Sequence, residues 1–298
     1  MNKHLGLLQK RTAEVRRENG FTLVELMVAL AISGLVLSAA HTIYKSQQRS
    51  YVVQEQVAAI QQNLRGGAYC MCREIRMAGY DPQGSRNFGI IDVGLDHNAN
   101  GTITFTLDDN LNGAENESDG NGEVDDREKF VYSLYDYPTA NPDGILDLGR
   151  KYGATRQLLA ENIEALGFAY AFDRTGDGDN LPDRDMNGHI IWAIDSDNDK
   201  ELDINLDTTN DGVIDLNDDP EGELLSHIDN GGLIGVKLSD IRVVRIWLLV
   251  RGDRDNPAFV NNMTYVVSNQ RITPKDGVWR RLLTATVRCR NLGVMPNN

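Results

Sequence analysis

Glu25 is the only ionisable side chain among the twenty apolar or small residues 21–40. A segment of that length can cross the hydrocarbon core of a bilayer as a helix. A carboxylate inside such a segment is costly, and it is rare unless a partner or a function retains it. Glu25 is therefore the first side chain for which we expect a function.

The junction just before Glu25 is the second candidate. A charged leader ends on Gly20, and the apolar run begins at once with Phe21. No small-residue cleavage site follows the run, so a conventional signal peptidase has nothing to cut. Cleavage on the cytoplasmic side, between Gly20 and Phe21, would leave the apolar helix on the mature chain and free an α-amino group close to Glu25. The alternative is an ordinary signal peptide or N-terminal anchor, which is the more common fate of such a segment.

Acidic repeats are the third candidate. Calcium-loop positions 1, 3, 5, 6, 9 and 12 are matched by Asp207, Thr209, Asp211, Gly212, Asp215 and Asp218. The first part of the same pattern, positions 1, 3, 5 and 6, also occurs at Asp183, Asp185, Asn187 and Gly188, and at Asp96, Asn98, Asn100 and Gly101. Two further groups lack the glycine: Asp195, Asp197 and Asp199, and the looser Asp173, Asp177 and Asp179. These residues predict calcium as a cofactor.

None of these loops has the bidentate Glu at position 12, so we expect a dissociation constant of roughly 10⁻⁴ to 10⁻³ M. The alternative is that the acidic stretch is only a solvated or disordered loop. Residues 173–223 carry seventeen Asp and Glu residues against Arg174, Arg184 and Lys200.

The elements that position these residues can be read from periodicity. Apolar residues recur at steps of three and four through residues 53–78, which extends the apolar segment into an amphipathic helix. We expect one helix from about Phe21 to about Met77, with residues 21–43 in the membrane and residues 44–79 against a folded domain. Gly66 and Gly67 interrupt the pattern and mark an expected bend. Gly79 and Pro82 end it.

Residues 80–298 are predicted to form a β-rich domain outside the membrane. Apolar residues alternate in residues 103–107, 130–134, 166–172, 244–250 and 283–289, each typical of a half-buried strand. Helical patterns are absent between them, which favours an antiparallel sheet whose apolar face covers the helix. The expected fold class is α+β, with acidic insertions near residues 92–128 and 173–223.

Charge and motif content narrow the function. The net charge is −14, and the first 20 residues carry five basic and two acidic side chains, so the remainder carries −17. This asymmetry predicts a cytoplasmic N-terminus and an external body. An acidic body disfavours nucleic acid as a partner. Neither metalloprotease, nucleophile-elbow nor phosphate-loop motifs occur, so we expect no enzymatic activity.

The three cysteines are too few for a disulfide-rich scaffold. Free buried thiols are one possibility, but export to an oxidising compartment favours a bridge. Cys72 lies at the edge of the helix stripe, and Cys289 alternates with Val287 and faces the core. We predict a Cys72–Cys289 disulfide that leaves Cys70 free.

The segment GFTLVE, residues 20–25, resembles the class III signal of type IV pilins and pseudopilins without departure. The resemblance implies that Gly20 precedes the bond cut by the prepilin peptidase and that Phe21 becomes the methylated first residue. It also implies that Glu25 pairs with the N-terminus of a neighbouring subunit. An ammonium is a natural partner for a carboxylate in a low-dielectric environment.

Three later segments, residues 158–173, 240–253 and 279–293, resemble PilW-type minor pilins, which are similar to the J-type minor pseudopilins of type II secretion. This likeness implies a pilin-like fold and a structural subunit that primes a type IV pilus. The implied partners are other pilins, the prepilin peptidase and the inner-membrane assembly machinery. The implied location is the inner membrane, in a single pass, and then the pilus on the cell surface. A secretion pseudopilin, or an anchored calcium-dependent binding protein or enzyme with a borrowed signal, remains an alternative.

Overall fold

A computed structural model describes residues 20–108, 122–138, 142–174, 179–218, 228–229, 232–233, 236–257 and 259–293. The chain divides into two compact units, Met1–Gln54 and Glu55–Asn298. The expected leader, residues 1–20, lies outside the described residues except for Gly20.

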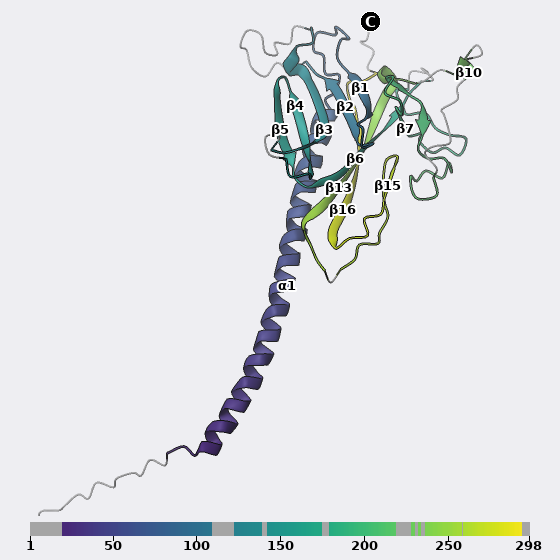
Figure 1. Ribbon diagram of the computed structural model, residues 1–298. Helices are drawn as coiled ribbons and strands as arrows, with labels where there is room; N and C mark the ends of the chain where they lie inside the picture. Colours follow the sequence, from purple (N-terminus) through teal and green to yellow (C-terminus); the bar gives the residue numbers. More distant parts are fainter. Residues whose placement is uncertain are drawn as a thin grey trace, which may run out of the picture. The chain divides into compact units, whose positions relative to one another are not determined.

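A single helix, α1 (Leu23–Ile75), contains the apolar segment and the amphipathic segment predicted from the sequence (Figure 1). Helical structure continues through Gly66 and Gly67, where a bend was expected. Gly67 has a packing role, because a Cβ there would lie 2.9 Å from Leu148 Cδ2 and 3.3 Å from Ala160 Cβ. After Ile75 the chain turns, and Gly79 adopts a positive φ of 76°.

The described residues of the first unit are the N-terminal part of α1 and the three residues before it. Side chains from Gly20 to Tyr51 are exposed, including large apolar ones such as Leu35 and Leu37. By length and composition, α1 is long and apolar enough to cross a membrane. So much exposed apolar surface requires lipid or another protein to cover it.

The second unit contains a five-stranded antiparallel sheet in which each strand pairs with the next in sequence. Its strands are β1 (Ile90–Leu95), β2 (Gly101–Thr106), β3 (Lys129–Asp136), β4 (Leu146–Tyr152) and β5 (Thr155–Ala160). A short 3₁₀ helix, η1 (Asp126–Glu128), precedes β3. Short turns suffice to join neighbouring antiparallel strands, which accounts for the sequential order.

A second five-stranded sheet has the order β16-β13-β6-β7-β9. These strands are β16 (Val278–Arg288), β13 (Ile241–Asp255), β6 (Ile163–Phe172), β7 (Ala193–Ile194) and β9 (Ile204–Asn205). All pairs are antiparallel, and the long β13 pairs with β6 on one side and β16 on the other.

The second unit also contains shorter elements. The short antiparallel pairs are β8 (Glu201–Leu202) with β12 (Val236–Lys237), β10 (Ile228–Asp229) with β11 (Gly232–Leu233), and β14 (Tyr265–Val267) with β15 (Gln270–Ile272). The 3₁₀ helix η2 (Leu238–Asp240) leads into β13. All five predicted strand patterns fall in β2, β3, β6, β13 and β16 or within one residue of them.

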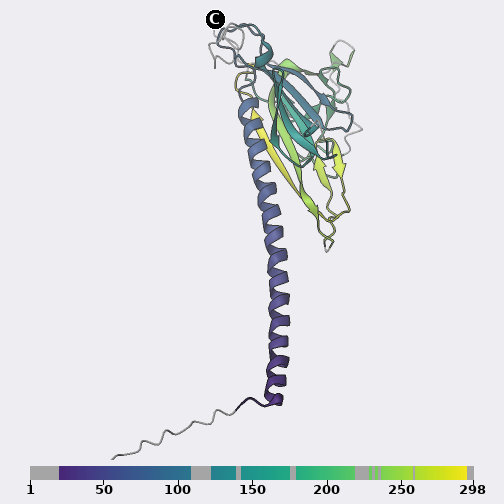
Figure 2. The ribbon, with the colours of Figure 1, turned by 60° about the vertical axis from the view of Figure 1, so that its left-hand side comes forward.

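The main core of the second unit lies between α1 and the two sheets. Its helical residues are Ile60, Leu64, Met71 and Ile75, which meet strand residues such as Leu148 and Leu248. Figure 2 shows this part of α1 running alongside the strands. The structure is therefore α+β, with the helix stripe buried against antiparallel sheets.

A second core covers the opposite face of the second sheet. The acidic insertion supplies Trp192, Ile194 and Leu206 to it, and β13 supplies Trp247 and Leu249. The sequence pattern predicted one apolar face for each strand, whereas β13 is buried on both faces. The described part of the acidic insertion is therefore a folded cover and not only a solvated loop.

Candidate functional site

The start of α1 is organised by a reciprocal pair of hydrogen bonds between Thr22 and Glu25. The Thr22 amide and hydroxyl each donate to Glu25 Oε2 at 2.9 Å, and the Glu25 amide donates to Thr22 Oγ1 at 3.2 Å. This is a capping box, which satisfies amide groups that have no partner inside the helix. The spacing T-x-x-E is visible in the sequence, so a search for capping motifs would have found the capping role of Thr22.

The residues around the expected cut are open to other molecules. Phe21 is 92% exposed. A Cβ added at Gly20 would meet no heavy atom within 4 Å. Within the described chain, folding therefore places no steric demand for glycine at position 20. Such a demand would come from a protein that binds this segment.

The best-spaced acidic repeat forms a closed loop in the structure. The amides of Asp211 and Gly212 donate to the Asp207 carboxylate at 3.2 and 2.7 Å, and Gly212 has a φ of 85°, as a tight turn at position 6 requires. The Asp218 carboxylate accepts from the amides of Thr208, Thr209 and Asp215. Asp207 and Asp218 thus point at backbone amides of their own loop.

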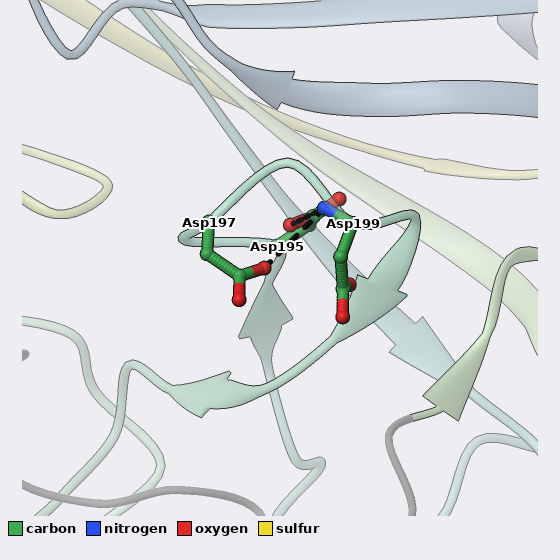
Figure 3. A group of neighbouring side chains, drawn as sticks. All are labelled: Asp195, Asp197 and Asp199. Carbon is green, nitrogen blue, oxygen red and sulfur yellow. Dashed lines mark hydrogen bonds between the residues drawn. The ribbon is translucent and has the colours of Figure 1, made fainter.

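Among the described residues, a group of three carboxylates with oxygens within 4.8 Å of one another is found at Asp195, Asp197 and Asp199 (Figure 3). Asp195 is buried, while the other two are exposed. Amides of Asn198, Asp199 and Lys200 donate to Asp195, but desolvation outweighs them and raises the pKa of its carboxyl group. This group lacks the glycine at position 6, and Lys200 occupies that position with a φ of 74°.

Each of the two remaining loops packs against one of the loops described above. In the first, Asn187 Nδ2 donates to the Asn210 carbonyl at 3.0 Å, which joins the loop of Asp183 and Asp185 to that of Asp207. In the second, the Leu95 amide donates to Asn198 Oδ1 at 2.8 Å, which joins the Asp195 loop to the hairpin that contains Asp96. Sequence-distant repeats are thus neighbours in space.

Two of the three carboxylates of the looser cluster, those of Asp173 and Asp179, belong to the described residues. Asp173 is buried with its Oδ2 3.8 Å from Arg242 Nε, whereas Asp179 accepts from the Leu181 amide. Asp177 lies outside the described residues.

The predicted Cys72–Cys289 disulfide is not formed in the structure, and all three cysteines are free thiols. Cys289 is part of the main core, and Cys72 packs against it from the helix. Burial raises the pKa of the Cys289 thiol to about 12 and also raises that of Cys72. Neutral thiols pack as small apolar groups here, so this core is filled without a covalent bond.

A buried polar network joins α1 to the first sheet, and sequence reasoning missed it. Glu74 is only 7% exposed, and it accepts from the Tyr132 hydroxyl and from Arg150 Nη1. Desolvation, followed by the nearby Glu74 charge, raises the pKa of Tyr132 well above its ordinary value. The sequence feature that could have revealed this network is the Glu74 carboxylate, which lies in the apolar stripe between Met71 and Ile75. A buried carboxylate there requires a cationic or hydroxyl partner.

Two parts of the chain match known protein families. Residues 15–40 match the prokaryotic N-terminal methylation motif, and residues 133–291, more than half of the chain, match the family described as type IV pilus-assembly protein W. No curated protein matches the chain. Among solved structures, a type IV-like pilin from Thermus thermophilus matches with a TM-score of 0.41 and 17% identity, over 78% of this chain and 97% of that one.

Proposed function

Because the chain belongs to the type IV pilus-assembly protein W family, we propose that it is a minor pilin that primes or joins a type IV pilus. The N-terminal methylation motif and the exposed apolar half of α1 support this proposal. The role is structural, and the partners are other pilins and the prepilin peptidase.

The observation that carries the proposal is the hydrogen bonding of the two Glu25 carboxylate oxygens. Its Oε2 is used by Thr22, while Oε1 accepts no hydrogen bond from the described residues. Cleavage after Gly20 would place an α-ammonium group on Phe21 of each mature subunit. Glu25 Oε1 of one subunit would then accept from the ammonium group of its neighbour. In an apolar filament core this pairing would offset the cost of burying both charges.

Substitutions at Glu25 and at Thr22 separate the effect of the Glu25 charge from the effect of the helix cap. Glu25→Gln keeps an acceptor for the Thr22 amide and removes the negative charge, whereas Thr22→Val keeps the charge and removes the capping hydroxyl. We expect Glu25→Gln to be cleaved and inserted in the membrane but to be absent from sheared filaments. Thr22→Val should still enter filaments, with a less stable helix start, by about 1 kcal/mol. Normal incorporation of Glu25→Gln would contradict the charge-pair role.

The choice between a pilus and a secretion pseudopilus is tested by deleting the gene. Loss of surface pili with normal secretion of enzymes supports the proposed function. Loss of secretion with normal pili assigns the chain to a type II secretion system instead.

We also propose that the acidic loops bind calcium with the weak affinity expected from their spacing. The support is the loop from Asp207 to Asp218, where the turn at Gly212 and the inward carboxylate of Asp207 match the expected frame. Calorimetric titration of the full chain in detergent micelles should give a dissociation constant of roughly 10⁻⁴ to 10⁻³ M. Asp211→Asn should lower the heat of calcium binding. Asp143→Asn, a control in the segment between β3 and β4, should leave that heat unchanged. Absence of calcium heat and of a thermal shift would exclude the proposal.

A further inference from the structure

Strand β16 is the outer strand of the second sheet. It is hydrogen-bonded to β13 over most of its length, and among the described residues no strand pairs with its other side. An unpaired edge presents a row of backbone donors and acceptors to which another extended chain can bind. Figure 1 shows β16 in yellow at this edge, beside β13.

A groove of about 770 Å³ runs beside β16 on the face of the sheet that is opposite α1. Trp247, Leu282 and Thr284 line this groove, and Trp247 and Thr284 are paired across β13 and β16. Leu216 and Met263 also line it, and they are 59% and 64% exposed. In an added strand, every second side chain would face this groove.

The edge is basic in a chain whose net charge is −14. Arg281 and Arg288 lie on β16 and are exposed. Arg288 donates to the neutral Asn180 carbonyl, and neither arginine forms an ion pair with a described carboxylate. Arg280 differs, because Glu164 and Asp276 neutralise it. Two uncompensated positive charges therefore lie on β16, with Arg281 in the part that lines the groove and Arg288 beyond it.

We infer that β16 is a docking strand for an extended acidic segment of a neighbouring subunit, with apolar side chains of that segment in the groove. The backbone edge would supply the main-chain hydrogen bonds, Trp247 and Leu282 the apolar contact, and Arg281 and Arg288 the charge selection. An acidic segment fits this edge, whereas a basic one would be repelled. The inference rests on the proposed function only in making the partner a pilus subunit.

The test uses the full chain in detergent micelles and a fluorescent peptide that alternates Glu and Val. The Glu/Val peptide should bind, and a Lys/Val peptide of equal length should not. The double variant Arg281→Glu with Arg288→Glu should bind the Glu/Val peptide at least about tenfold more weakly, or about 1.4 kcal/mol. Lys151→Glu is the matched control, an exposed charge reversal on β4 of the other sheet, and should leave binding within about twofold.

Hydrogen exchange identifies the mode of binding. Amides of β16 should exchange more slowly when the Glu/Val peptide is bound, because strand addition covers the free edge. Equal binding of both peptides, unchanged binding by the double variant, or unchanged exchange in β16 would each overturn the inference. This measurement needs no cleavage or filament, so its failure leaves the proposed minor-pilin role intact, and failure of Glu25→Gln to behave as expected leaves this result intact.

Discussion

The Tyr132 hydroxyl donates a 2.6 Å hydrogen bond to Glu74 Oε2 inside the second unit, and this contact ties α1 to β3. Arg150 from β4 donates to the other oxygen of the same carboxylate. Helix α1 and two neighbouring strands, whose partners are 58 and 76 positions from Glu74, therefore meet at one buried charge, which is satisfied on both oxygens. A buried network of this kind specifies one position for the helix on the sheet.

Removing the hydroxyl should destabilise this unit. We expect Tyr132→Phe to lower the free energy of unfolding by about 1–3 kcal/mol, because it leaves a buried carboxylate oxygen without its donor. Tyr69→Phe, at an exposed position of α1, should change it by less than about 0.5 kcal/mol. Denaturant unfolding of the full chain in micelles measures both. Equal midpoints for the two variants would show that the network contributes nothing to stability.

The two adjacent glycines of α1 should respond in opposite directions. Gly67→Ala places a Cβ against Leu148 and Ala160 and should cost about 1–3 kcal/mol through overpacking. Gly66→Ala meets no heavy atom within 4 Å and should stabilise the helix by about 0.5–1 kcal/mol. Thermal unfolding of the pair checks this, and a stabilising Gly67→Ala would contradict the close approach of α1 to the sheets.

The Asp276 carboxylate should make stability depend on pH. Its hydrogen bonds from Arg280 lower its pKa to about 2, below the ordinary value of 3.8. The folded state therefore holds the charged form more strongly than the unfolded chain does. This contribution is present above pH 4 and is lost as the pH falls toward about 2. Asp276→Asn should flatten the stability profile in this window, and Asp143→Asn should leave it unchanged.

Thiol labelling follows from the burial of the cysteines. Because burial raises the pKa of Cys289 to about 12, its thiolate is scarce, and alkylation should occur only after unfolding. Cys70 is more accessible and should react in the folded chain. Peptide mass mapping of native and unfolded samples distinguishes them. A peptide pair joined through Cys72 and Cys289 would show that the bridge forms in the exported protein.

The sequence predicted the elements whose periodicity is strong. The stripe with Leu64 and Met71 indicated α1, and alternation indicated β2, β3, β6, β13 and β16. It did not indicate β4, where Gly149, Arg150 and Lys151 interrupt the apolar pattern. Gly149 is nonetheless required there, since a Cβ would lie 2.1 Å from the Tyr135 ring.

The acidic insertion shows why charge content is a poor guide to local structure. Its carboxylates suggested a solvated loop, yet Trp192 and Leu206 within it are buried against β13. Nothing in the spacing of these two residues indicates a common core, because their contacts are made through the pairing of β7 and β9. The capping box at Thr22, in contrast, involves only residues 22–25, so its pattern can be recognised in the sequence.

The proposed minor-pilin role depends most directly on the N-terminus of the mature chain. Mass spectrometry of the membrane-inserted protein should find a chain that begins at Phe21 and carries N-methylation, and Gly20→Phe should retain the whole leader while still inserting. Gly20 has no packing role in the described chain, so loss of cleavage in this variant would report on the peptidase and not on folding. A mature chain that begins at any other residue would contradict the minor-pilin proposal.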